Sequence, residues 1–129
     1  GRSHTESSMR FDMSNCGRIA RLATQREPTM TPWEELSAEE REDLIHDAMA
    51  FYFCECVKIG DVSAAHRTFV SMRSTEGWTR GPKNIEARTS PLIAPWTELD
   101  ESGQRRQSAL YDAARETVDV TLRFTHPLN

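Results

Sequence analysis

The sequence predicts an α-rich α+β fold, in which two main helices pack with a shorter helix and a small β-hairpin or extended segment. Apolar residues recur at helical spacing in two stretches, residues 44–57 and 109–122. Between these stretches, glycines and prolines gather over residues 77–95, a pattern that favours turns and short extended pieces. A chain of 129 residues has room for one domain built from these elements.

The first main helix is predicted over residues 38–59. Ser37 and Glu40 have the spacing of a capping box, in which the Ser hydroxyl and the Glu carboxylate each accept a backbone N–H. Acidic residues crowd the first turns, where the positive end of the helix dipole favours them. Gly60 is a stop signal at the other end.

A shorter helix is expected next, over residues 62–72. Asp61 or Ser63 can cap its first turn, because both side chains carry an oxygen that accepts a backbone N–H. The stretch also contains the apolar residues Ala64, Ala65, Phe69, Val70 and Met72.

The second main helix is expected to start near Asp100 and to continue to about Leu122. Gly103 weakens its first turn by about 1 kcal/mol relative to Ala, so the helix is expected to be firm only from about Gln104. Residues 125–129 are predicted to form a tail.

A short segment occurs twice, each time before a predicted main helix. In both copies Pro-Trp favours an extended approach, and a Leu stands just before the cap residue, where it can form half of a hydrophobic staple. The simplest interpretation is one helix-start device used twice; the alternative is a true duplication of unusually short length. The copies read Pro32-Trp33-Glu34-Glu35-Leu36-Ser37 and Pro95-Trp96-Thr97-Glu98-Leu99-Asp100.

Residues 1–31 are polar and weakly patterned, so we expect a tag remnant followed by an N-terminal arm. Met9 is a plausible natural start. Ile19 and Leu22 would support a short helical turn or an arm that packs on a partner, and disorder is the alternative. The folded domain is therefore predicted to span residues 32–124.

Composition and charge exclude several classes of function. A net charge of −4 argues against nucleic-acid binding, and no apolar run approaches the ~20 residues that span a bilayer. Three cysteines without a signal-peptide pattern favour a reducing compartment, the cytoplasm. The sequence contains no phosphate-binding loop, hydrolase or metalloprotease motif. We expect a protein that is not an enzyme and that holds neither a metal nor a cofactor.

The cysteines and histidines are given structural roles. Cys54 and Cys56 point to different faces of a helix, so they are expected to be small helix residues, at least one of them buried. His46 is expected at the buried edge of the first main helix. His66 is expected on a solvated helix face.

The most suggestive passage for binding is Gly77-Trp78-Thr79-Arg80-Gly81-Pro82. An exposed indole beside Arg80 would offer a flat stacking surface together with a partner for an anion, which suits a nucleotide. The alternative is that Trp78 fills the core between the helices.

Residues 36–122 resemble the RyR domain, the repeat named after ryanodine receptors. The resemblance rests on the Gly-Trp-x-x-Gly-Pro turn at residues 77–82 and on the segment Ser90-Pro91-Leu92-Ile93-Ala94-Pro95-Trp96-Thr97-Glu98-Leu99, followed by a helix with a central Tyr111. This chain departs from the family at Ser90, where a His is common, and residues 60–75 look like an insertion.

The resemblance implies a non-enzymatic module that binds a nucleotide-derived small molecule, as a sensor or sequesterer in a bacterium or a phage-infected bacterium. An adenine-nucleotide-type ligand is the expected partner. The implied ligand-binding residues are Trp78, Arg80, Gly77, Gly81, Thr79 and Tyr111. Receptor repeats occur in tandem pairs, so a single repeat is expected to form a homodimer in which two Trp78 rings flank a base. A protein-interaction or phage structural module with no small ligand is the alternative.

Overall fold

Four helices dominate the computed structural model, which describes the fold of residues 13–125. The helices are α2 (Met13–Arg26), α3 (Ala38–Cys56), α4 (Val62–Thr75) and α5 (Glu101–Thr125). Short 3-10 helices η1 (Trp33–Glu35) and η2 (Trp96–Glu98) precede α3 and α5, and the strands β1 (Thr79–Arg80) and β2 (Thr89–Ser90) form a small sheet. This architecture confirms the predicted α-rich α+β fold.

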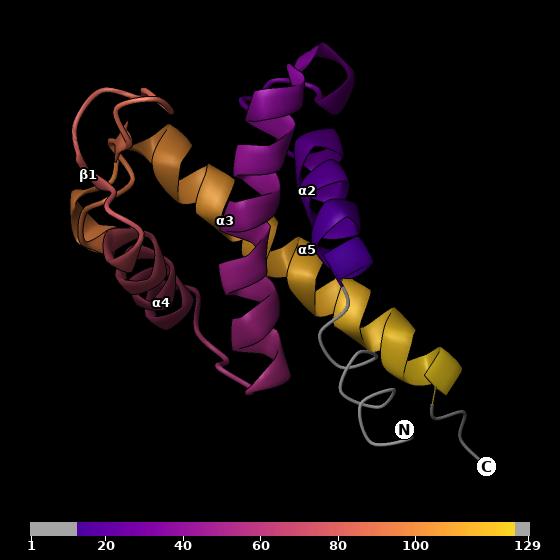
Figure 1. Cartoon of the computed structure of the whole chain (residues 1–129). Coiled ribbons are helices and arrows are strands. Elements are labelled where there is room, and N and C mark those ends of the chain that lie inside the picture. Colours follow the sequence, from indigo (N-terminus) through magenta and orange to yellow (C-terminus); the bar gives the residue numbers. More distant parts are fainter. Residues whose placement is uncertain (1–12, 126–129) are drawn as a thin grey trace, which may run out of the picture.

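Helices α2 and α3 lie side by side, and α5 crosses behind them (Figure 1). Helix α4 packs on the side of α3 away from α2, near the first half of α5 (Figure 1). The core between these helices contains fully buried Ile19, Phe51 and Leu110, together with Phe69 from α4.

Residues 13–26 form helix α2 and not the N-terminal arm that the sequence predicts. Cys16, Ile19, Ala20 and Ala23 have no exposed surface, and they pack on α3 and α5 as part of the core. Residues 13–26 therefore belong to the folded domain, although the domain was predicted to begin at residue 32. The tag remnant and the tail after residue 125 lie outside the described residues.

Local signals place the starts of α3 and α4 correctly. Ser37 accepts the backbone N–H of Glu40, whose side chain accepts the backbone N–H of Ser37, so the capping box is present. Asp61 accepts the N–H of Ala64 at 3.2 Å and caps α4. Helix α3 ends at Cys56, three residues before the predicted end, because Lys58 adopts a left-handed conformation with φ of 64°.

Helix α5 begins at Glu101, earlier than Gly103 suggested. Asp100 accepts the N–H of Gly103 at 2.8 Å and caps the first turn. A Cβ at Gly103 would lie 3.2 Å from the capping Asp100 Oδ1, which is a tight contact, and at ordinary contact distances from Leu92 and Leu99. The glycine therefore allows the start of α5 to pack closely against the chain that precedes it.

The two strands pair in parallel, so they are not the two arms of a hairpin. Thr79 N–H donates to the Arg88 carbonyl at 2.9 Å, and Gly81 N–H donates to the Ser90 carbonyl at 3.2 Å. The connection of residues 81–88 first turns back through an antiparallel bridge between Asn84 and Thr89. Among the described helices, none has the length and apolar character needed to cross a membrane.

Candidate functional site

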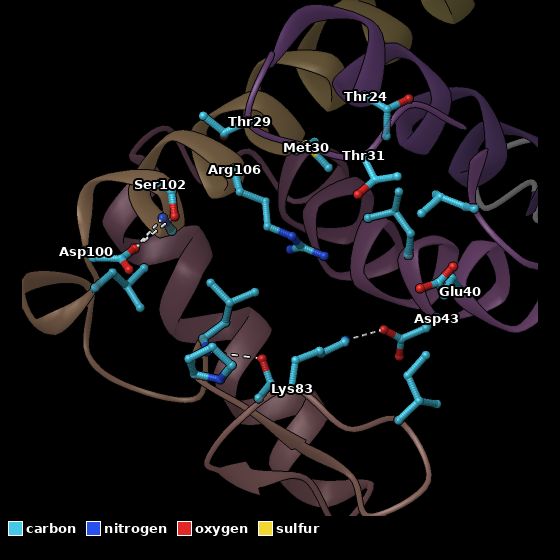
Figure 2. A pocket seen from close by; sticks show the side chains of 18 of the residues that line it. Thr24, Thr29, Met30, Thr31, Glu40, Asp43, Lys83, Asp100, Ser102 and Arg106 are labelled. Carbon is cyan, nitrogen blue, oxygen red and sulfur yellow. Dashed lines mark hydrogen bonds and ion pairs between the residues drawn. The ribbon is translucent and has the colours of Figure 1, made fainter. Parts of the chain in front are cut away.

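A pocket of about 480 Å³ lies where α3 and α5 begin (Figure 2). Its walls come from residues 29–31 after α2, from the first turns of α3 and α5, and from the chain between β1 and η2. This volume is within the range of sites that hold small organic ligands, about 300–1,000 Å³. Apolar side chains make up part of the wall: Met30, Leu36, Leu44, Ile85, Leu92 and Leu99.

Three cationic side chains line the same pocket: Arg80, Lys83 and Arg106. Figure 2 shows Arg106 and Lys83 reaching toward the middle of the pocket from opposite walls. Arg80 is exposed and forms an ion pair with Glu98 at 2.8 Å. Arg80 and Lys83 belong to one segment, at the end of β1 and just after it, whereas Arg106 comes from α5, so the fold brings Arg106 to the other two.

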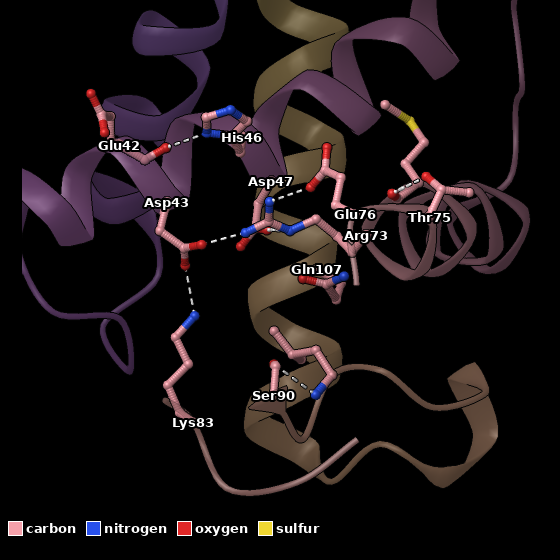
Figure 3. Close-up of polar contacts among 12 residues, drawn as sticks. Glu42, Asp43, His46, Asp47, Arg73, Thr75, Glu76, Lys83, Ser90 and Gln107 are labelled. Carbon is pink, nitrogen blue, oxygen red and sulfur yellow. Dashed lines mark hydrogen bonds and ion pairs between the residues drawn. The ribbon is translucent and has the colours of Figure 1, made fainter. Parts of the chain in front are cut away.

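An ion network lies along one side of the pocket, and Figure 3 shows four of its members, Asp43, Asp47, Arg73 and Lys83. Buried Asp43 pairs with Arg73 and, at 2.7 Å, with Lys83. Buried Asp47 pairs with Arg73 at 3.1 Å and with Arg106 at 2.8 Å. We use "ion network" below for these five residues. Each buried carboxylate thus contacts two cations, as buried charges require.

The charges that line the pocket nearly balance. Three cations, Arg80, Lys83 and Arg106, face four carboxylates, Glu40, Asp43, Glu98 and Asp100. Each of these cations already pairs with a carboxylate: Arg80 with Glu98, Lys83 with Asp43, and Arg106 with Asp47. An anionic group beside Lys83 and Arg106 would therefore share cations that the carboxylates already hold in place.

A hydrogen-bonded chain extends from Arg106 into the core. Arg106 donates to the side-chain oxygen of Gln107 at 2.9 Å, so the Gln107 amide nitrogen faces His66 and donates to its Nδ1 at 2.9 Å. His66 Nε2–H donates to the Ala94 carbonyl at 2.7 Å. Each ring nitrogen of His66 then has a partner that suits the neutral ring.

His66 was expected on a solvated face, but it has no exposed surface. Burial lowers its pKa, an effect that the hydrogen bond to Ala94 opposes. His46 differs in the opposite sense: it was expected at a buried edge, but it is exposed, with Nδ1 3.0 Å from the Glu42 carbonyl.

Trp78 is buried, with 7% of its surface exposed, so the expected outward-facing indole is wrong. Gly77 has φ of 94°, which turns the chain back at the end of α4, and Trp78 N–H donates to the Arg73 carbonyl at 3.1 Å. The ring then contacts the Arg73 guanidinium, 4.5 Å from the ring centre, and the Lys83 ammonium at 5.0 Å. Trp78 is not among the pocket-lining residues and supports the cations instead.

The other implied ligand residues are dispersed. Arg80 lines the pocket. Gly77 and Gly81 shape the turn and the strand edge, and Thr79 is exposed on β1. Tyr111 is buried on α5, with Arg115 over its ring at 5.7 Å. The implied residues therefore do not form one site, and only Arg80 belongs to the pocket.

Sequence reasoning missed Lys83 and Arg106 as residues of a site. The duplicated segment predicts that the first turns of α3 and α5 are built alike, and the pocket lies between these turns. Nothing in the sequence indicates that these two helix starts face each other across a shared space.

Cysteines and metal-ligating side chains contribute no second centre within the described part of the chain. Cys54 is fully buried and Cys56 is exposed, which confirms that at least one of the pair is buried. Burial raises the pKa of the Cys54 thiol, which keeps it protonated. Among the described residues, no three His, Cys, Asp or Glu side chains are placed to hold one metal ion.

Neither protein-family models, nor curated proteins, nor solved structures match this chain in sequence or fold comparisons. The resemblance to the RyR domain therefore stays a prediction.

Proposed function

We infer that this protein is a non-enzymatic binding module for a nucleotide-derived small molecule, acting as a sensor or sequesterer in the cytoplasm of a bacterium or a phage-infected bacterium. The ligand site is the pocket between the starts of α3 and α5. This location replaces the surface around Trp78 that the sequence suggested, because that indole is buried.

The observation that carries the proposal is the composition of the pocket wall. Lys83 and Arg106 supply charge for a phosphate, and leucines and Met30 supply apolar surface for a base or sugar. Glu40 and Asp100 add carboxylate oxygens that accept hydrogen bonds from ribose hydroxyls or an exocyclic amine. A nucleotide carries all three kinds of group.

Calorimetry with ADP, cyclic AMP and ADP-ribose tests the proposal. Wild-type protein is expected to bind at least one of them with a micromolar dissociation constant. Lys83→Met is expected to weaken that binding about tenfold or more, since it removes a charge-assisted hydrogen bond but keeps an apolar side chain.

Arg67→Met is the matched control, because Arg67 is an exposed cation on α4 that does not line the pocket. It is expected to leave the dissociation constant unchanged. No heat from any of the three nucleotides, or equal effects of the two substitutions, would contradict the proposal.

A homodimer remains part of the proposal, although burial of Trp78 removes the arrangement in which two Trp78 rings flank a base. Sedimentation velocity with and without the bound nucleotide measures the state of assembly directly. A monomer under both conditions would remove the dimer but leave the pocket proposal in place.

The alternative is a protein-interaction or phage structural module without a small ligand. One observation favours it: Phe53 and Val57 are 41% and 50% exposed and stand four residues apart at the end of α3. Two exposed apolar side chains on one face of a helix end are typical of a surface that contacts another protein. If no nucleotide binds, this surface becomes the leading candidate for function.

A further inference from the structure

The two segments that precede α3 and α5 have the same backbone structure. Glu35 N–H donates to the Pro32 carbonyl at 2.9 Å, and Glu98 N–H donates to the Pro95 carbonyl at 2.9 Å. Leu36 and Leu99 each donate to the carbonyl of the preceding Trp at 3.2 Å. The duplicated sequence therefore builds a duplicated start, as the single helix-start device predicts.

The likeness continues into the helices. Trp33 O accepts a hydrogen bond from Arg41 Nε at 3.1 Å, and Trp96 O accepts one from Gln104 Nε2 at 3.0 Å. Arg41 and Gln104 occupy the same position relative to their segments. A side chain from the second turn thus holds each start in the same way.

Both copies present equivalent positions to the pocket. When the two segments are aligned, Leu36 corresponds to Leu99, Glu40 to Gly103, and Asp43 to Arg106, and all six residues line the pocket. The pocket is therefore bounded by two helix starts with the same backbone structure but different side chains: Glu40 and Asp43 on α3, and Gly103 and Arg106 on α5.

The charges are arranged in order along the pocket. In Figure 2, Glu40 lies toward one end and Asp100 with Ser102 toward the other, and Arg106 and Lys83 enter between them. Leu36 and Leu99 belong to opposite helix starts. An apolar side chain and a hydrogen-bond acceptor are thus available at each end. Two cations lie between them, Lys83 paired with Asp43 and Arg106 paired with Asp47.

We propose that the ligand has two ends joined by a phosphate linkage: two sugar-containing groups connected by a diphosphate, as in a nucleoside diphosphate ribose. The linkage lies between Lys83 and Arg106. Each sugar-containing group lies against one helix start, where a leucine packs on it and a carboxylate accepts its hydroxyl protons.

This inference rests on the proposed function and narrows it. A mononucleotide such as ADP would use the central cations and one end only, so half of the wall would contact water. A two-ended ligand fills both ends with a single loss of translational freedom, and its affinity is therefore higher.

One substitution at each end tests the inference. Thr31 is exposed and lies at the Glu40 end, and Ser102 is exposed and lies at the Asp100 end (Figure 2). Thr31→Phe and Ser102→Phe each fill one end with a ring. Calorimetry of ADP and ADP-ribose is then compared across wild type and both variants.

Ser63→Phe is the matched control. The Ser63 hydroxyl donates to Asp61 at 2.7 Å in the first turn of α4, just as the Ser102 hydroxyl donates to Asp100 at 3.2 Å in α5. Ser63 does not line the pocket. The control therefore reports the effect of a Phe in a capped first turn, separate from any effect on the pocket.

Wild type is expected to bind ADP-ribose at least tenfold more tightly than ADP. Each Phe substitution is expected to weaken the binding of ADP-ribose at least tenfold. Only one of the two is expected to weaken the binding of ADP to that degree. The two-ended ligand is overturned if ADP and ADP-ribose bind with equal affinity and the same Phe substitution leaves the binding of both unchanged. The nucleotide pocket would still stand in that case. Absence of binding by both ligands overturns this inference, and absence of heat from cyclic AMP as well overturns the proposed function.

Discussion

Arg73 is the residue on which the charge balance beside the pocket depends. Its guanidinium contacts both buried aspartates of the ion network and lies against the Trp78 ring. Without Arg73, Asp43 and Asp47 would keep one cation each, Lys83 and Arg106, both more exposed than Arg73. Burial of a carboxylate with incomplete pairing is among the most costly defects in a fold.

Arg73→Met is therefore expected to lower the free energy of unfolding by about 3–5 kcal/mol. Arg80→Met is the comparison: Arg80 and Glu98 are each more than half exposed, so the loss of that ion pair is expected to cost less than about 1 kcal/mol. Urea denaturation measures both values. Equal costs for the two substitutions would show that the ion network contributes no more than a surface pair.

Residue-level errors of sequence reasoning have a common cause in this chain. Trp78 beside Gly77 and His66 beside Arg67 both have polar or flexible neighbours in sequence, which favours exposure. Each is buried by contacts that form only in the fold. Arg73 and Lys83 lie against the Trp78 ring, and Gln107 and Ala94, from distant segments, satisfy His66. Short sequence windows contain no information about such partners.

At the scale of elements, the helix starts could be predicted because caps are local. Ser37, Asp61 and Asp100 each accept a backbone N–H three residues later, within the same turn. Helix α2 was missed for the opposite reason. Among its buried residues only Ile19 has a large apolar side chain, so the pattern is weak, and the small or polar ones become a core face only when α3 and α5 pack closely against them: Asn15, Cys16, Ala20, Ala23 and Thr24.

His66 of α4 joins two other elements, because it contacts Gln107 of α5 and Ala94 before η2. This buried histidine predicts that the stability of the fold depends on pH. His66 of α4 is neutral in the folded state, and its lowered pKa means that the unfolded chain binds a proton at higher pH than the folded protein does. The stabilising contribution is fully present above the ordinary His pKa of about 6.5. It is lost as the pH falls from that value toward the pKa of the folded state.

Unfolding free energies at pH 7.5 and pH 5.5 measure this effect, with His66→Gln as the comparison. Gln keeps one donor and one acceptor but does not titrate. Wild type is expected to lose more stability on acidification than the variant, by at most about 1.4 kcal/mol per pH unit for one proton. Parallel pH profiles would mean that His66 does not couple folding to protonation.

At the scale of the whole molecule, the pocket depends on helix packing as well as on loops. Thr24 of α2 and residues 29–31, which follow α2, form part of its wall, and α2 itself is held by α3 and α5. Helix α2 thus contributes both to the core and to the pocket wall. Sequence patterns predicted the two long helices whose starts line the pocket, but not α2, which leads into residues 29–31 of its wall.

Ile19→Ala tests whether the domain begins at α2. Ile19 is fully buried between α2 and the other helices, so its truncation is expected to lower the free energy of unfolding by about 2–5 kcal/mol. Met13→Ala on the same helix is the control, because Met13 is 49% exposed and its truncation is expected to change stability by less than about 0.5 kcal/mol. Denaturant unfolding followed by circular dichroism gives both values. If residues 13–26 were an arm outside the domain, the two substitutions would have equal effects on stability. If α2 is a core helix, Ile19→Ala is the more costly by several kcal/mol. Because α2 leads directly into residues 29–31, Ile19→Ala is also expected to weaken nucleotide binding in the pocket.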